Sequence, residues 1–336
     1  MLLSSKQNYG RGSGHAARKS VHLFVRVMMK VLEDPSLEMW EGVASHCEGA
    51  TFYHSPLWSK ALVETYPHYV SSPKGFLFDD GSKALLPLLS FNKRSFLKKK
   101  IRYKSMGFGS YGGLVSTGSW SEEKNEQIYN WLKASGASIY IDGNPFSTYD
   151  LPACFVREQR STYALRLDTS IEGIWKGFSS GHRKSIKKAS RMGVTVRKAT
   201  SYDDYRTYLA VYEDTLTRWG EKTIITFPHD LLLQLLEPQH DTVTLWLAIL
   251  EDKVIAGVIM VYWNAICCGW HGCSLTDFSS YHPNNLLHWY MIQDALERHY
   301  QFYDFGPSGE EQKGVADFKR HFGAEQFLFT SGYVRQ

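Results

Sequence analysis

Residues 194–333 alternate between strand-like and helix-like patterns in an order that few architectures accommodate. A short strand is followed by two helices, by three consecutive strands that we expect to pair antiparallel, and then by a helix, a strand, a helix and a last strand. We expect these elements at 194–198, 201–219, 228–236, 244–250, 254–263, 265–273, 286–300, 301–305, 315–322 and 326–333. This order predicts a mixed sheet with helices on both faces, in a domain of about 150 residues.

The first half of the chain repeats this pattern in weaker form. We expect helices at 37–46, 56–66 and 122–134, and a hairpin that pairs 75–79 with 83–91.

One short piece recurs at the same place in both series. The helix at 122–134 leads into 139–145, and the helix at 286–300 leads into 302–307; each piece is an apolar strand that ends in Asp, Gly and Pro. We interpret the recurrence as a duplicated domain. The predicted fold class is therefore α/β, with two tandem domains that each contain a mixed, mostly antiparallel sheet flanked by helices. The expected divisions are a flexible basic tail at 1–20, a first domain at 21–165 and a second domain at 166–336.

Positive charge is concentrated in three stretches that contain no acidic residue. The chain carries 38 Lys and Arg against 34 Asp and Glu, a net charge of +4, and the four basic residues in 1–20 account for all of it. The stretches at 93–104 and 176–198 hold seven and eight further basic residues. A solvated face is one interpretation of such a run, and a positive surface for an anionic partner is the other, which is favoured for 176–198.

The composition excludes several classes of protein and of site. A hydrophobic fraction of 43% supports a full core, and no run of about 18 apolar residues is present to span a membrane. The five cysteines show no Cys-x-x-Cys spacing, so we expect free thiols and no metal site. The apolar stretch at 21–32 contains Arg26 and Lys30 and lacks a cleavage pattern, so we expect a cytoplasmic location.

Two segments near the end of the chain carry candidate catalytic groups. Asp304 begins the sequence Asp-Phe-Gly-Pro, where a strand ends and a loop leads to a helix, the usual position of a ligand in an open α/β sheet. Stabilisation of a turn by the Asp304 side chain is the alternative interpretation. Phe318 and Phe322 share a helix face that we expect to pack in the core, which leaves Lys319 either to reach a phosphate or carboxylate or to face solvent.

The helix expected at 175–191 carries a comb of basic side chains. Arg183 and Lys187 lie on one helical line, and three further basic residues lie on the next. This arrangement suits a polyphosphate or an RNA backbone. No Ser-His-Asp or Cys-His constellation can be assembled by motif, so covalent catalysis has no support.

Several motifs together resemble those of the FemABX family, non-ribosomal peptidyltransferases built from two tandem GNAT acyltransferase domains. The motifs follow the family's order at 52–58, 182–189 with 193–194, 217–220, 283–289, 304–306, 318–319 and 322–323. The first is similar to the family's aromatic-x-x-Ser-x-x-Trp segment, the second to Arg-x-x-Ile-x-Lys-Ala with Gly-Val, and the third to Arg-x-Gly. The resemblance spans 50–330 and implies two GNAT-like domains in tandem.

The resemblance also implies roles for particular residues. In the family, the Phe-Lys pair and the Arg of the Arg-x-Gly segment lie at the cleft that holds a nucleotide-linked precursor, which assigns Phe318, Lys319 and Arg218 to that cleft. Lys319 would stabilise a developing oxyanion or a phosphate, and Asp304 would orient groups or handle a proton. The full set of candidates is Lys319 and Asp304 for catalysis, Arg218, Phe318, Trp58, Trp270, His271 and Asn285 for the substrate, and Arg183 and Lys187 for the donor, with no metal ligand.

Two departures from the family pattern bear on the donor. The loop with which GNAT enzymes hold the coenzyme A pyrophosphate is expected near 279–285, and this segment contains no glycine. Backbone amides therefore cannot wrap a phosphate there in the usual way. The helical arm that some members insert in the second domain is also absent. We expect no tightly bound cofactor, and an activated donor that is aminoacyl-tRNA in preference to acyl-CoA.

The expected function is direct transfer of an aminoacyl or acyl group from this donor to an amine of a cell-envelope precursor. The expected partners are a nucleotide- or lipid-linked precursor as acceptor and charged tRNA, with peripheral membrane contact as an option and the oligomeric state left open. Two alternatives remain. One is a coenzyme-A-dependent N-acetyltransferase of cell-envelope or exopolysaccharide biosynthesis, and the other is a non-catalytic relative that binds nucleotides or RNA.

Overall fold

The computed structural model describes residues 28–93, 100–108, 111–220, 226–236, 241–308 and 313–334. The predicted basic tail at 1–20 lies outside these residues, as does part of the basic stretch at 93–104. No helix in the described ranges combines the length and the apolar character that crossing a bilayer requires.

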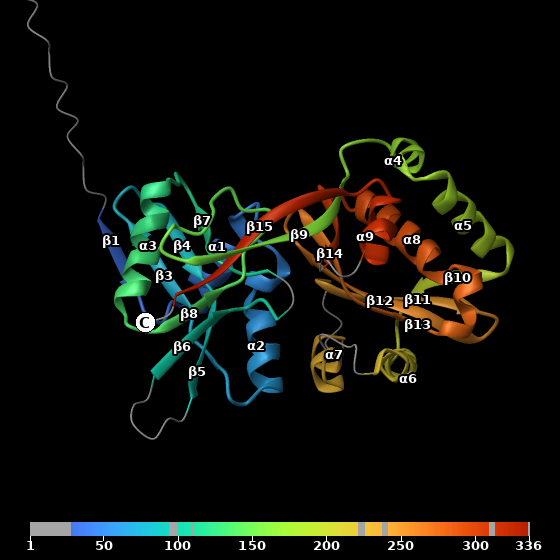
Figure 1. Cartoon of the computed structure of the whole chain (residues 1–336), viewed down its shortest axis with the longest axis horizontal. Helices are drawn as coiled ribbons and strands as arrows, with labels where there is room; N and C mark the ends of the chain where they lie inside the picture. The colour runs from blue at the N-terminus through green and yellow to red at the C-terminus, as the bar shows by residue number, and fades with distance from the viewer. Residues whose placement is uncertain are drawn as a thin grey trace, which may run out of the picture.

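A single large sheet runs through both halves of the chain (Figure 1). Within the described residues it has eleven strands. In spatial order these are β10 (Val194–Lys198), β11 (Val243–Leu250), β12 (Lys253–Trp263), β13 (Ile266–Ser274), β14 (Phe302–Pro307), β9 (Val156–Arg166), β15 (Glu325–Val334), β8 (Ser138–Ile141), β6 (Lys100–Ser105), β5 (Leu88–Lys93) and β2 (Val70–Ser71). The three strands predicted to pair antiparallel, β11 to β13, do so.

The two halves exchange strands at the centre of this sheet. Strand β9, which follows the first half in the chain, pairs with β14 of the second half. Strand β15, near the end of the chain, pairs with β8 of the first half, and β9 and β15 pair antiparallel with each other. The predicted division between residues 165 and 166 falls at the end of β9, and no feature of the structure tests it as a domain boundary.

The pairing pattern on either side of β9 and β15 is the same. Strands β13 and β14 lie parallel, with 266–268 opposite 302–304, and strands β6 and β8 lie parallel, with 102–104 opposite 138–140. The two Asp-Gly-Pro pieces thus occupy equivalent places, at the ends of β8 and β14. The predicted α/β class, with mixed sheets flanked by helices, is confirmed.

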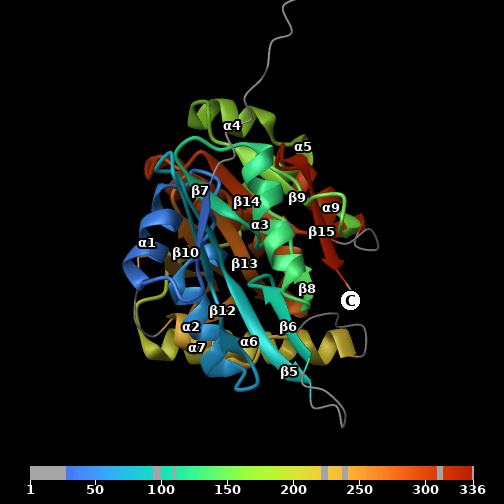
Figure 2. The same ribbon diagram turned by 90° about the vertical axis from the view of Figure 1, so that its left-hand side faces the viewer.

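Helices cover both faces of the sheet in the second half. Helices α6 (Tyr202–Trp219) and α7 (His229–Leu236) lie on the face toward the first half, where α7 contacts α2 (Pro56–Thr65) (Figure 2). Helices α4 (Ile171–Gly177), α5 (Ser180–Arg191), α8 (Pro283–Glu297) and α9 (Lys313–Arg320) cover the other face. Neighbouring residues of β13 face opposite sides of the sheet. Cys268 packs in the core on the side of α6 and α7, and Cys267 packs in the core on the side of α5 and α8.

The first half contains a second sheet of four strands among the described residues. Its order is β1 (Met29–Leu32), β3 (Lys74–Phe78), β4 (Lys83–Leu86) and β7 (Val115–Thr117), and helices α1 (Leu37–His46) and α3 (Glu122–Ala134) accompany it. The continuous strand predicted over 83–91 is wrong. Pro87 has no N–H to donate to a ladder, and at this residue the chain passes from β4 in the small sheet to β5 in the large one.

The single helix predicted over 175–191 is also wrong. This segment contains parts of two helices, α4 and α5, because the Ser179 side chain accepts the backbone N–H of His182 and so caps a new helix. Five further strands were not predicted from the sequence, namely β1, β2, β6, β7 and the central β9.

Candidate functional site

The candidate site lies where β13 and β14 separate. The two parallel strands pair over only three residues, and a Cβ built on Gly306 would lie 3.4 Å from the carbonyl oxygen of Gly269. Gly306 has a φ of +78°, which an L side chain rarely adopts. Beyond this point β13 follows β12 to Ser274, whereas β14 ends at Pro307. The opening between carboxyl ends of parallel strands is the usual ligand position in α/β sheets.

Lys319 reaches this opening from the last turn of α9. Its Nζ donates to the carbonyl oxygens of Gly306 at 2.7 Å and Pro307 at 3.2 Å, and to the hydroxyl of Ser308 at 2.6 Å. Burial lowers the pKa of Lys319 to about 8, and the nearby charge of Asp304 opposes this shift. The ammonium group is thus mainly protonated at neutral pH and uses all three donors. Of these three acceptors, the Ser308 hydroxyl is the one that belongs to a side chain.

Phe318 supports the helix that carries Lys319. Its ring packs against His182 and His288, with centroids 5.0 and 5.5 Å apart, and against Phe322 at 5.3 Å. Burial lowers the pKa of His182 to about 4 and that of His288 to about 3, so both rings are neutral at pH 7. Phe318 therefore belongs to an uncharged packed layer beneath Lys319.

Asp304 joins the two halves of the molecule. Its carboxylate accepts the hydroxyl of Tyr111 at 2.6 Å, the hydroxyl of Thr162 at 2.7 Å and the backbone N–H of Gly306 at 2.9 Å. The side chain is fully buried, and burial raises its pKa above the ordinary value of 3.8. The bond to Gly306 is the turn-stabilising interaction that was the alternative to a catalytic role. Tyr111 and Thr162 are partners that the sequence analysis missed.

Replacing Asp304 by asparagine should preserve the fold and lower the free energy of unfolding by about 1–2 kcal/mol, because one accepting oxygen is lost. In the native chain the raised pKa of Asp304 makes its contribution to stability fall as the pH rises from 3.8 through the folded-state pKa. Asp304→Asn should lack this fall. Chemical denaturation at a series of pH values checks both effects. An unchanged stability with loss of acyl transfer would instead assign Asp304 a proton-handling role.

Trp270 and His271 of β13 lie next to each other on the sheet face toward the first half, and Trp58 of α2 packs on Trp270. Trp58 is fully buried, its ring centroid is 5.3 Å from that of Trp270, and its Nε1–H donates to the carbonyl oxygen of Met106 at 2.6 Å. His271 Nδ1 shares a hydrogen bond of 2.6 Å with the Tyr208 hydroxyl, and burial lowers the pKa of His271 to about 3. These contacts place Trp58 and His271 in the packed core between the halves.

Arg218 and Asn285 lie at the other side of the opening, near the end of β13. The exposed Arg218 guanidinium donates to the Thr276 hydroxyl at 2.5 Å and to the carbonyl oxygen of Ser274 at 3.4 Å. Asn285 is buried in the first turn of α8. The preceding residues 276–281 form a 3-10 helix in place of a phosphate-binding glycine loop. Arg218 and Lys319 therefore mark the two diverging strand ends.

The two predicted donor-binding residues, Arg183 and Lys187, make different contacts. Arg183 donates to the carbonyl oxygens of Lys176, at 3.0 Å, and Phe178, and so caps the end of α4. Lys187 is exposed on α5, with its Nζ 5.9 Å from the centroid of the Trp175 ring. Lys187 alone of this pair faces a cavity.

That cavity, here called the α5–α8 groove, has a volume of about 590 Å³. Its lining residues are Trp175, Lys184, Ile186, Lys187, Ser190, Arg191, Leu286, Trp289, Tyr290 and Gln293. Three of them are cations and none is an acid. The rings of Trp175 and Trp289 lie 4.8 Å apart at its base, and Tyr290 is 41% exposed. The comb of basic residues was predicted from the sequence, whereas the aromatic side of the groove was not.

The described residues contain no group of three or more His, Cys, Asp or Glu side chains placed to hold a metal ion. All five cysteines are free, and the three on β13 are buried.

Comparisons with known proteins agree with this geometry. Residues 157–320 match the family described as an acetyltransferase (GNAT) domain. The structure of FemX has 12% sequence identity and a TM-score of 0.66, covering 90% of this chain and 96% of that chain. No curated protein matches the sequence.

Two further structures share the fold. The C-terminal DUF2156 domain of a putative lysylphosphatidylglycerol synthetase from Agrobacterium fabrum has 11% identity and a TM-score of 0.57, with 89% of this chain and 92% of that chain covered. A conserved protein of unknown function from Bacteroides thetaiotaomicron has 11% identity and a TM-score of 0.57, with 92% and 100% covered. The resemblance to FemABX proteins is thus confirmed at the level of the fold.

Proposed function

We propose that this chain, whose residues 157–320 match the acetyltransferase (GNAT) domain family and whose fold is similar to that of FemX, transfers an aminoacyl group from charged tRNA to an amine of a cell-envelope precursor. The amine nitrogen forms a bond to the activated carbonyl carbon, and the bond from that carbon to the donor oxygen breaks. The proton lost by the nitrogen ends on the leaving oxygen. The transfer is direct, without an acyl-enzyme, and a nucleotide- or lipid-linked precursor supplies the amine.

Lys319 is the group that best fits the transition state of this reaction. Attack on a carbonyl concentrates negative charge on its oxygen, and a buried cation held in place stabilises that charge without reorganisation. Lys319 meets these conditions, since its Nζ is fixed by three acceptors at the end of β14. Arg218, across the opening, would hold a phosphate of the acceptor.

The α5–α8 groove is the observation that favours a nucleic acid as the donor. Its cations Lys184, Lys187 and Arg191 suit phosphates, and its tryptophan rings suit stacking of bases. The absence of acids from its lining removes the repulsion that a phosphate backbone would meet.

Replacing Lys187 by glutamine should weaken the binding of charged tRNA about 3- to 10-fold at fixed salt and lower the salt slope by about 1, because one phosphate contact is lost. Lys188→Gln is the matched control, since Lys188 is exposed on the same helix but does not line the groove. Calorimetric titration of both variants measures the difference. Equal weakening by both would mean that α5 attracts RNA only through its general charge.

The family match also favours a second candidate, an acyl-CoA-dependent N-acyltransferase of envelope or exopolysaccharide biosynthesis. The 3-10 helix at 276–281 and the missing glycines oppose pyrophosphate binding at the start of α8. Titration with acetyl-CoA separates the two donors, because tight binding would put this candidate first. Binding of charged tRNA without transfer to any amine would indicate a non-catalytic relative.

A further inference from the structure

The first half contains a cavity that is separate from the proposed site of transfer. Its volume is about 560 Å³, and neither Lys319 nor Arg218 lines it. It is bounded by residues 46–49, by 112–118 and Trp120, by the segment 143–151 that follows β8, and by 328–330 of β15. We call it the first-half cavity.

The lining of this cavity is rich in hydroxyl and amide groups and poor in positive charge. Besides Tyr129 and Tyr149, the side chains that carry such groups are Ser116, Thr117, Asn125, Asn144, Ser147, Thr148, Gln159 and Thr330. Glu48 and Asp150 add two acids. Among the lining residues, all of which the structure describes, His46 is the one able to carry a positive charge. No Lys or Arg lines the cavity, and the guanidinium beside it, Arg157, is already paired with Asp150 at 3.6 Å and with the carbonyl oxygen of Leu151. A neutral or positively charged ligand with many hydroxyl groups fits this chemistry.

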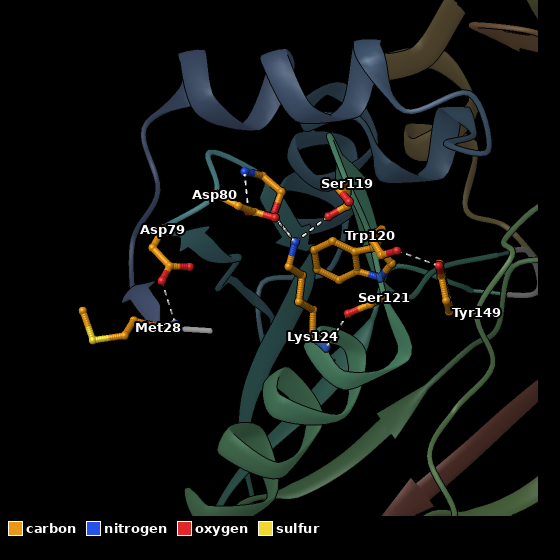
Figure 3. A network of polar contacts seen from close by, with 9 residues as sticks. Met28, Asp79, Asp80, Ser119, Trp120, Ser121, Lys124 and Tyr149 are labelled. Atoms are coloured by element: carbon orange, nitrogen blue, oxygen red, sulfur yellow. Dashed lines mark hydrogen bonds and ion pairs between the residues drawn. The ribbon is translucent and has the colours of Figure 1, made fainter. Parts of the chain in front are cut away.

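Trp120 provides an apolar surface in the cavity and is held rigidly (Figure 3). The Nζ of Lys124 donates to the carbonyl oxygen of Ser119 and pairs with Asp80, both at 2.5 Å, and lies 5.9 Å from the Trp120 ring centroid. The Tyr149 hydroxyl donates to the carbonyl oxygen of Trp120 at 2.9 Å. These bonds fix the backbone on both sides of Trp120, as a preorganised binding surface requires.

Two amide side chains join the remaining walls. Asn144 donates to the carbonyl oxygen of Gly49 at 2.8 Å, and Asn125 donates to that of Asp150 at 3.0 Å. The segments that surround the cavity are thus cross-linked by hydrogen bonds, and the cavity does not depend on a ligand to hold its shape.

We propose that the first-half cavity binds a saccharide that carries no phosphate. A sugar ring has C–H groups on its faces for the Trp120 ring, and hydroxyl groups at its rim for the amide and hydroxyl side chains. Glu48, the lining acid that Arg157 does not pair with, also admits an amino sugar. That the saccharide is part of the acceptor rests on the proposed function, whereas the binding itself does not.

Titration of the full chain with tri-N-acetylglucosamine, followed by calorimetry, tests this inference without any donor. We expect saturable binding in the millimolar range and a loss of about tenfold or more in Trp120→Leu. Trp131→Leu is the matched control, because Trp131 packs on Phe76 outside the cavity and should leave binding unchanged. Gln159→Ala, at an exposed lining position of β9, should weaken binding about threefold and serves if Trp120→Leu does not fold.

Three outcomes would overturn the inference. The first is a titration that does not saturate up to the solubility limit of the sugar. The second is binding that Trp120→Leu, Trp131→Leu and Gln159→Ala all leave unchanged. The third is tighter binding of N-acetylglucosamine 1-phosphate than of N-acetylglucosamine. Competition by an extended peptide paired to the edge strand β7 would assign the cavity to a different ligand class. Sugar binding that persists in a chain inactive in transfer would retain this inference and reject the proposed function.

Discussion

Replacing Lys319 by methionine should lower kcat for acyl transfer about 100- to 1000-fold while changing KM little, because the lost interaction forms with charge that exists only in the transition state. Methionine keeps an unbranched, flexible side chain that is shorter only by the terminal ammonium group, and it removes the charge. Lys313→Met is the matched control, since Lys313 is exposed at the start of the same helix. Steady-state kinetics with a donor and acceptor found by the titrations above would measure both variants.

A pH profile separates this role from a purely structural one. Because burial lowers the pKa of Lys319 to about 8, its cation is present below that pH and is lost above it. The native rate should therefore fall as the pH rises past about 8, and this limb should be missing in Lys319→Met. If Lys319→Met retains the native kcat, Lys319 only fastens the carbonyls of Gly306 and Pro307 and takes no part in the reaction.

Replacing Trp58 by alanine should lower the free energy of unfolding by about 3–5 kcal/mol, as expected when a large buried aromatic side chain leaves a cavity. Trp58 is fully buried and contacts Tyr53 of its own half and Trp270 of the other. Its loss also leaves the carbonyl oxygen of Met106 without this donor.

Trp58→Phe tests the packing and the hydrogen bond separately. It keeps an aromatic ring and should cost about 1–2 kcal/mol. Chemical denaturation followed by circular dichroism measures both variants. A Trp58→Ala chain of native stability with impaired acceptor binding would support the substrate-binding role predicted from the sequence and contradict the core role found in the structure.

The second half was predictable because its signals are local. Ser201 accepts the backbone N–H of Asp204 at the start of α6, and Gly193 ends α5 with a φ of +86°. Each of these residues marks an element boundary through its own chemistry. Strand β9 has no such marker. Its first four residues, 156–159, are exposed, and all but Val156 are polar. Its place is set by pairing with β14 and β15, which come much later in the chain.

Only part of the candidate site followed from the sequence. Lys319 was found through a motif, and the structure places it at the strand opening. The contacts of Arg183 were not foreseen, because helical spacing shows which residues share a line but not that the end of α4 lies beside them. Tyr111 and Thr162 meet Asp304 from distant segments, and no local pattern marks such partners.

The exchange of strands also determines the order in which the molecule can be completed during synthesis. Strand β8 is paired with β15 at residues 141 and 332, so its partner leaves the ribosome roughly 190 residues later. At about 5–20 residues per second, this delay is on the order of 10–40 s. During that time the edge of β8 has no β15 to cover it, and an uncovered edge invites pairing with other chains. We therefore expect the nascent first half to be the stage at which mispairing with other chains competes most strongly with folding.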